Sequence, residues 1–256
     1  MSKNILFVVE GERTEPRFLK RLVTVMRTYR DYKVFSYSAN IYRMLEGMFI
    51  NRDIDEDLDF LEYLRSCRGQ TDPDKVLDME FSDIFLFFDM DPQDQKYDPE
   101  KLRKAVLYFN DSTENGKLYI NYPMMESFRH ISNPEDLSFL DVMVQRDQIP
   151  RYKERVAREG TPELSDISKV SESMMLRIIT LYLLKATLMI TGKPEMPTAD
   201  LFREEITQSN ILSEELRSLS GNDELFVLNT CVFNTIDYNS QRFFERMNNK
   251  GSDDIS

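Results

Sequence analysis

The stretch FLFFDMDPQD, residues 85–94, places three acidic side chains directly after a run of apolar ones. The four residues before the acids are apolar, as expected of a strand buried on both faces of a parallel sheet, and Asp89, Asp91 and Asp94 follow at once. Carboxylates this close together repel one another unless a positive charge lies near them. The stretch therefore predicts a buried strand that ends at a site holding a cation.

The first half of the chain alternates between strand patterns and helix patterns. Strands are predicted at NILFVVEG (4–11), KVFSYS (33–38), FSDIFLFFD (81–89) and KLYINYP (117–123). Helices are predicted from Glu15-Pro16 onward, around 41–50 and 55–66, and from Asp98-Pro99 to about Asn110, with a loop at 69–75 and a turn at Asn115-Gly116. This alternation predicts an α/β fold with a parallel sheet, of the Rossmann-like kind.

From about residue 133 onward the sequence shows helical patterns and no strand series. We therefore predict a catalytic domain over 1–132, a helical accessory or docking region over 133–250, and a flexible tail over 251–256. The apolar run MMLRIITLYLLKATLMI is interrupted by Arg177 and Lys185, which favours a buried amphipathic helix over a membrane span.

The composition narrows the classes of function. The 256 residues carry a formal net charge of −12, which argues against a protein that binds nucleic acid by coating phosphates with Lys and Arg. Cys67 and Cys231 lack a CxxC spacing, and His130 is the only histidine, so zinc sites and two-histidine catalysis are not indicated. We expect all three residues to be structural. No signal-peptide pattern precedes Glu10, which favours the cytoplasm.

Acidic side chains follow three of the four predicted strands. Glu10 follows the first strand, Asp89 and Asp91 end the third, and Glu126 follows the fourth in NYPMMES. Because functional groups collect at the carboxyl ends of parallel strands, we expect these acids to share one crevice. An oxygen ligand set without histidine or thiolate suits Mg²⁺ or Mn²⁺. Such ions would polarise a phosphate and lower the pKa of an attacking water.

Two motifs resemble those of Toprim domains. VEGERTEPRFL (9–19) is similar to their glutamate motif, and FDMD (88–91) is similar to their DxD motif, in the same order and on the same strands. The resemblance covers about the first half of the chain. Its EGxxTE form resembles the RloB-like and overcoming-lysogenisation-defect groups of phage-defence proteins, which include the Toprim effector of PARIS systems. It implies a toxic, metal-dependent endonuclease that acts on DNA or RNA, tRNA included, in abortive infection.

Carried over by position, the resemblance assigns Glu10 as the motif glutamate and Asp89 and Asp91 as metal-binding aspartates. Toprim DxD motifs often continue with a third Asp two residues on, where this chain has Gln93, with Asp94 one residue later. The resemblance also implies a separate ABC-type ATPase partner, docked on the helical half, and a homodimer on release. The chain itself contains no GxxxxGK[ST] loop.

The remaining candidates each have a functional and a structural interpretation. They are Glu15 and Lys96 as catalytic residues, Asp94 and Glu126 as metal ligands, and Arg13, Arg17 and Arg21 as nucleic-acid contacts. The structural interpretations are an acid at a helix start, a polar turn, and a solvated helix face.

The alternative from a different class is a non-catalytic interaction subunit, in which the helical half binds a partner and the acids are structural. Phosphatases of the haloacid-dehalogenase type also use a DxD motif, but on their first strand, whereas this one follows the third predicted strand. Topoisomerases and primases share a Toprim metal site but add domains for which this chain has little room.

Overall fold

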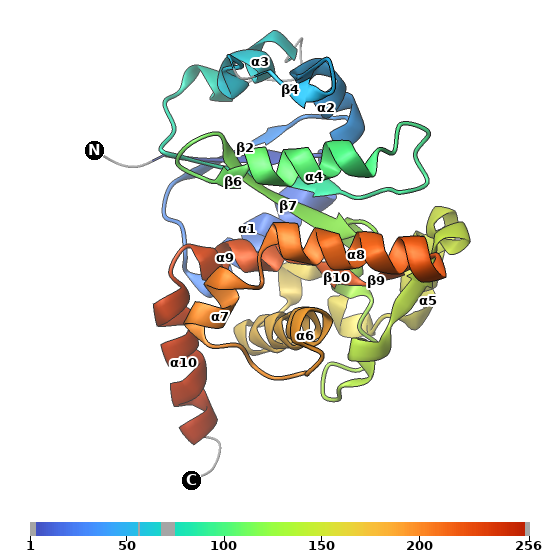
Figure 1. Cartoon of the computed structure of the whole chain (residues 1–256). Helices are drawn as coiled ribbons and strands as arrows, with labels where there is room; N and C mark the ends of the chain where they lie inside the picture. The colour runs from blue at the N-terminus through green and yellow to red at the C-terminus, as the bar shows by residue number, and fades with distance from the viewer. Residues whose placement is uncertain (1–3, 56, 68–74, 254–256) are drawn as a thin grey trace.

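The computed structural model describes residues 4–55, 57–67 and 75–253 and has a mixed α/β architecture around one mostly parallel sheet (Figure 1). The strand order is β10-β7-β5-β1-β2, with β6 paired to the start of β7. The strands are β1 (Ile5–Val9), β2 (Tyr32–Ser36), β5 (Asp83–Asp89), β6 (Asn110–Asp111), β7 (Gly116–Tyr122) and β10 (Leu228–Asn229). All four predicted strands are present, and they run parallel, which confirms the α/β class.

The two central strands bring the first acids together. β1 pairs with β5 in a register that runs from Ile5 beside Asp83 to Val9 beside Phe87, and the side chains of β1 are all buried. Such continuous apolar sequences form strands that are covered on both faces. Because the two strands end at the same edge, Glu10 lies beside the end of β5, where its N–H donates to the Phe87 carbonyl at 3.2 Å.

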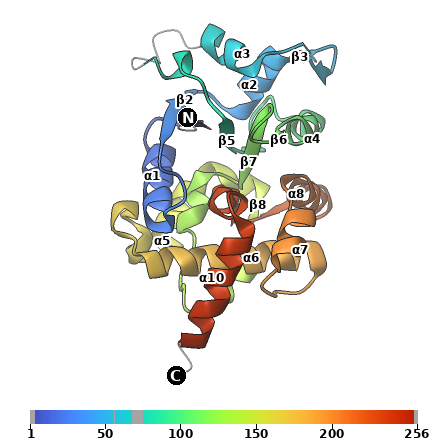
Figure 2. The ribbon, with the colours of Figure 1, turned by 90° about the vertical axis from the view of Figure 1, so that its left-hand side faces the viewer.

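Helices cover both faces of the sheet (Figures 1 and 2). α2, α3 and α4 lie over one face, whereas α1 and the long helix α6 lie over the other. The helices are α1 (Thr14–Met26), α2 (Ile41–Met48), α3 (Phe60–Cys67), α4 (Pro99–Tyr108), α5 (Tyr152–Glu159), α6 (Glu172–Thr191), α7 (Ala199–Glu204), α8 (Gln208–Asn222), α9 (Asn234–Asp237) and α10 (Ser240–Asp253). As predicted, the Asp98 side chain caps α4, where it accepts from the backbone N–H groups of Glu100 and Lys101.

The region between α2 and α3 differs from the prediction. An antiparallel ribbon follows α2, which therefore ends at Met48 and not at residue 50. Its strands are β3 (Phe49–Ile50) and β4 (Asp53–Ile54). The predicted helix start at 55 is wrong, because α3 begins at Phe60, where Asp59 accepts a backbone hydrogen bond at 2.9 Å. The predicted loop at 69–75 lies outside the described residues, apart from Lys75.

The second half of the chain contains strands, contrary to the prediction. The ribbon strands β8 (Met143–Gln145) and β9 (Glu224–Phe226) pair with each other, and β10 extends the central sheet antiparallel to β7. Thr230 Oγ1 donates to the Ile120 carbonyl at 2.8 Å and fastens the next segment to β7. These strands are too short to show a periodic pattern. α10 reaches Asp253, inside the predicted tail 251–256, and residues 254–256 lie outside the described chain.

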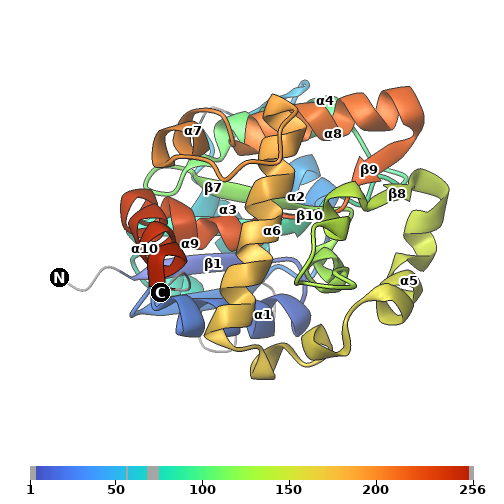
Figure 3. The same cartoon turned by 90° about the horizontal axis from the view of Figure 1, so that it is seen from below.

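α6 crosses the sheet as a core helix (Figure 3). In the described part of the chain it is the one helix long and apolar enough to cross a membrane, but most of it is buried inside the protein, as predicted. Ser171 caps its start, and Gly192, at φ +77°, ends it. The ammonium of Lys185, fully buried in the middle of α6, donates to the carbonyls of Phe139 and Val142 at 3.0 and 2.5 Å. Burial lowers the pKa of Lys185 to about 7.

Candidate functional site

An open pocket of about 590 Å³ lies at the carboxyl edge of β1 and β5. We call it the acid pocket. It is lined by Glu10, Gly11, Glu12, Arg13, Thr14, Glu15, Ser38, Ala39, Asn40, Asp89, Glu126 and Lys153. Acids from the ends of three predicted strands, Glu10, Asp89 and Glu126, therefore line one pocket, as expected for the carboxyl ends of parallel strands.

Glu10 lies in the interior of this pocket. Its Oε2 accepts a hydrogen bond from the backbone N–H of Asp89 at 3.1 Å. Burial raises the pKa of Glu10 to about 8, and repulsion from Asp91 and Glu15 adds to this increase. The carboxyl group is therefore costly to ionise unless a cation compensates it.

Asp89 is buried, with 8% of its surface exposed. Burial raises the pKa of this carboxyl, and the charges of Glu10 and Asp91 raise it further. The Asn121 side chain in β7 donates to Asp89 Oδ1 at 3.3 Å, and the Sγ of Cys231 donates to Asn121 Oδ1 at 3.1 Å. Asn121 therefore orients Asp89 and is itself oriented by the second half of the chain.

Asp91 begins the turn that follows β5. Its backbone has φ +40°, in the left-handed region, and its N–H donates to the Pro123 carbonyl at 3.2 Å. Burial raises the pKa of its carboxyl, which accepts from the Gln93 side chain at 3.0 Å. Asp94 lies further along this turn. Both of its carboxylate oxygens are engaged, by the Asn40 side chain at 2.7 Å and by the backbone N–H of Lys96 at 2.7 Å.

Glu15 is buried against the backbone of Gly11. A Cβ atom at Gly11 would lie 2.7 Å from Glu15 Oε2, so a larger residue at this position would displace the carboxylate. Burial raises the pKa of Glu15, whereas hydrogen bonds from its own N–H and that of Gly11 oppose the shift. Glu15 thus belongs to the pocket wall and also stabilises the loop that carries Glu10.

Lys153, in the first turn of α5, brings a positive charge to the acid pocket, which Arg13 also lines. Its Nζ lies 3.1 Å from Glu126 Oε1. Although partial burial acts in the opposite direction, the carboxylates of Glu126, Asp89 and Asp91 raise the pKa of Lys153. We did not predict Lys153 or Asn121. Nothing in the sequence distinguishes Lys153 from the other charged residues of YKERVARE, because its role depends on where α5 packs.

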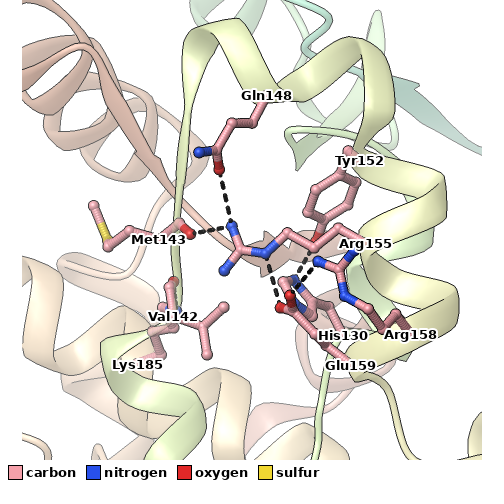
Figure 4. Close-up of polar contacts among 9 residues, drawn as sticks. All are labelled: His130, Val142, Met143, Gln148, Tyr152, Arg155, Arg158, Glu159 and Lys185. Atoms are coloured by element: carbon pink, nitrogen blue, oxygen red, sulfur yellow. Dashed lines mark hydrogen bonds and ion pairs between the residues drawn. The ribbon is translucent and has the colours of Figure 1, made fainter.

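α5 is held in place by a hydrogen-bond network around His130 (Figure 4). The imidazole contacts Tyr152 Oη through Nδ1 and Glu159 Oε2 through Nε2, both at 3.0 Å, and thereby joins the two ends of α5. Arg155 and Arg158 each donate to Glu159 at 2.8 Å. Although burial opposes the effect, hydrogen bonds from Arg158, His130 and Arg155 lower the pKa of Glu159 to about 2. His130 is therefore structural, as predicted, and the network fixes the helix that carries the lysine.

The remaining predicted site residues differ in position. Lys96 is half-exposed outside the acid pocket, and its Nζ contacts Glu46 Oε2 at 2.6 Å. Arg13 lines the pocket and Arg17 is exposed on α1. Arg21 instead donates through Nε and Nη2 to the Val170 carbonyl, at 2.8 and 2.5 Å, and fastens α1 to the segment before α6. These contacts do not favour a nucleic-acid role for Arg21.

The acid pocket has the donor types that Mg²⁺ or Mn²⁺ prefers. Its buried acidic side chains offer carboxylate oxygens, and burial and mutual repulsion raise their pKa values. Within residues 4–55, 57–67 and 75–253, however, no group of three or more His, Cys, Asp or Glu side chains is arranged so that it could hold a metal ion as it stands. The donor atoms of the pocket therefore suit such an ion, but the side chains are not arranged as a complete set of metal ligands.

Comparison of the chain with protein-family models, with curated proteins and with solved structures gave no match.

Proposed function

We propose that this protein is a Toprim-type endonuclease that uses Mg²⁺ or Mn²⁺ to cleave phosphodiester bonds of DNA or RNA, tRNA included. One observation carries the proposal. Glu10 and Asp89 lie at the ends of neighbouring parallel strands and meet in a pocket where burial and mutual repulsion raise the pKa of both carboxyls. Burial also raises the pKa of Asp91, which follows β5 but is not among the residues that line the pocket. Such a cluster is costly to maintain unless its function is to bind a cation.

Several residues of the chain would support this reaction. Glu10, Asp89 and Asp91 would hold the ion, which when bound polarises the phosphate and supplies Lewis-acid chemistry. Asn121 orients Asp89, and Glu126 holds the Lys153 ammonium at the rim of the pocket. Lys153 is positioned to offset the negative charge that develops on a phosphate during cleavage.

The surroundings of the acid pocket offer a path for a polyanion. Arg13 lines the pocket itself, and Asn40 joins it to a neighbouring depression of about 550 Å³ that Arg43 and Lys96 also line. These three cations would contact phosphates that flank the scissile one, because phosphate contacts position a nucleic acid without reading its sequence. A local basic rim reconciles a net charge of −12 with a nucleic-acid substrate.

We further propose that the enzyme is a cytoplasmic toxin of antiviral defence that causes abortive infection. It would be restrained by a separate ABC-type ATPase and act as a homodimer on release. The ATPase is proposed from the resemblance to phage-defence Toprim proteins. It would be a separate chain, because this sequence contains no phosphate-binding GxxxxGK[ST] loop. Co-purification from the native locus tests this idea. Recovery of the protein alone in a constitutively active state would contradict it.

The cleavage test uses plasmid, single-stranded DNA and tRNA, each with Mg²⁺, Mn²⁺ or EDTA. We expect metal-dependent cleavage by the native chain and its loss in Asp89→Asn and Glu10→Gln, with native circular dichroism in both variants. Glu12→Gln is the matched control, because Glu12 lines the same pocket but is exposed. Wild-type cleavage by either variant at saturating metal would refute the assignment. Absence of cleavage with every substrate would favour the non-catalytic interaction subunit.

A further inference from the structure

A second, basic depression lies at the opposite end of the parallel strands from the acid pocket. It comprises two adjoining pockets of about 1090 and 300 Å³ that share Arg27, Thr28, Tyr238 and Arg242. The larger pocket reaches Ile5 and Asp83, the first residues of β1 and β5. Figure 2 faces this side of the molecule and shows α10 between α1 on the left and α7 on the right. We call it the arginine groove.

Five arginines gather around this groove in a protein whose net charge is −12. They are Arg27, Arg30, Arg203, Arg242 and Arg246. Arg27 and Arg246 both form ion pairs with Glu172, and Arg203 forms an ion pair with Asp200 within α7. Arg30 and Arg242 have no ion-pair partner in the described chain. Such a concentration of guanidinium groups suits phosphate, which Arg binds through two hydrogen bonds.

The carboxylates in the same wall are already engaged. Asp237 contacts Lys117 Nζ at 2.8 Å and accepts from Tyr119 Oη at 2.6 Å. Asp83 accepts from the hydroxyl groups of two serines, Asp111 from Thr113, and Asp31 also has a partner. Hydroxyl donors do not neutralise these aspartates. The groove is nevertheless lined by six basic side chains, the five arginines and Lys117, and by four aspartates, which leaves its lining net positive.

An aromatic ring lies between the arginines. Tyr238, in the turn between α9 and α10, is 56% exposed and lines both pockets. Its ring rests edge-on against Tyr29, with 4.7 Å between centroids, and Tyr29 is fixed because its hydroxyl donates to the Asn234 carbonyl at 2.8 Å. The hydroxyl oxygen of Thr28 is buried without a hydrogen-bond partner in the described structure. An exposed ring and nearby guanidinium groups together suit a base joined to phosphate.

We propose that the arginine groove binds a nucleotide, with the base against Tyr238 and the phosphates against Arg242, Arg27 and Arg30. The volume of the larger pocket suffices for a whole nucleotide. The nucleotide is either a free one or a unit of a single strand. This site is separate from the acid pocket and does not depend on the proposed nuclease activity.

The test measures fluorescence anisotropy in EDTA with two probes, a fluorescent ADP analogue and a fluorescein-labelled single-stranded RNA of twelve nucleotides. We expect binding of at least one probe, weakened about tenfold by Tyr238→Ala and by Arg242→Ala, because one stacked base or one bidentate phosphate contact is lost. For the RNA, Arg242→Ala should also reduce the slope of log affinity against log salt by about 1.

Two controls separate this proposal from charge effects and from the nuclease proposal. Arg217→Ala, at a solvent-exposed arginine paired with Glu214 on α8, should bind like the native chain. Asp89→Asn should also bind normally, whatever its effect on cleavage. Binding of ADP alone identifies a free nucleotide, and binding of RNA alone identifies a strand. If neither probe binds, or if Arg217→Ala weakens binding as much as Arg242→Ala does, the proposal is overturned.

Discussion

Replacing Glu10 with Gln is expected to stabilise the metal-free protein at neutral and alkaline pH, although it alters a proposed catalytic residue. Burial raises the pKa of Glu10 from 4.5 to about 8 in the folded protein. Between these two values the folded state retains a proton that the unfolded state has lost. The free energy of unfolding of the native chain therefore falls as the pH rises through this interval. Gln at this position keeps a similar shape and an oxygen for the Asp89 N–H, but it does not ionise.

The size of the effect follows from the width of the interval. One pH unit corresponds to about 1.4 kcal/mol, so the interval from 4.5 to about 8 gives a loss of about 5 kcal/mol for a single site. At pH 7 the loss is about 3 kcal/mol on the same basis. We therefore expect Glu10→Gln and the native chain to have similar stability near pH 5. The variant should become more stable by about 3 kcal/mol at pH 7 and by about 5 kcal/mol at pH 9.

Urea unfolding in EDTA from pH 5 to pH 9 measures this difference. Circular dichroism at 222 nm is the suitable signal because the chain has no tryptophan. Glu12→Gln serves as the control, since this neighbouring glutamate is exposed and should leave the pH dependence unchanged. Parallel stability curves for Glu10→Gln and the native chain across this range would refute the electrostatic account of the acid pocket.

Three further outcomes are expected. Millimolar Mg²⁺ should raise the melting temperature of the native chain but not of Glu10→Gln. Calorimetry should show that Mg²⁺ binding releases more protons at pH 7 than at pH 9. Identical melting curves of the native chain in EDTA and in Mg²⁺ would contradict a metal site. Gly11→Ala should displace the Glu15 carboxylate and slow cleavage about tenfold in a kinetic assay. The circular dichroism spectrum should remain native. Unchanged cleavage would show that Glu15 is only structural. His130→Phe should destabilise the fold by about 2 kcal/mol in urea unfolding, because two buried hydrogen bonds are lost. It should also reduce cleavage, because Lys153 is no longer held in position, while Mg²⁺ binding is retained. Normal cleavage would show that the hydrogen-bond network does not support the acid pocket.

The sequence predicted the parallel strands because burial on both faces requires continuous apolar runs. It also predicted that Glu10 and Asp89 meet, because acids at the ends of neighbouring parallel strands share an edge. Asn121 escaped notice because an amide inside an apolar strand has no signature of its own. Lys153 escaped notice because a lysine on an amphipathic helix is normally a solvated residue, and only the packing of α5 brings it to Glu126.

The sequence patterns also did not predict very short strands or which residue a side chain contacts. β10 has two residues, and it is a strand because the edge of β7 offers unpaired backbone groups to it. Arg21 has the same helical spacing as Arg13 and Arg17, yet a carbonyl 149 residues away accepts its hydrogen bonds. Periodicity identifies the side of a helix on which a residue lies, but it does not identify the residue that it will contact.

The link from Cys231 through Asn121 to Asp89 has a consequence for the order of events during synthesis on the ribosome. Glu10, Asp89 and Glu126 leave the exit tunnel early, but the thiol that orients Asn121 is added 110 residues after it. The lysine at the pocket rim also comes later than every predicted acid. A nascent chain that has released only the parallel strands thus carries the acids without their support. If the protein is a toxic nuclease, this arrangement would delay its activity until the segment that carries Cys231 has been synthesised.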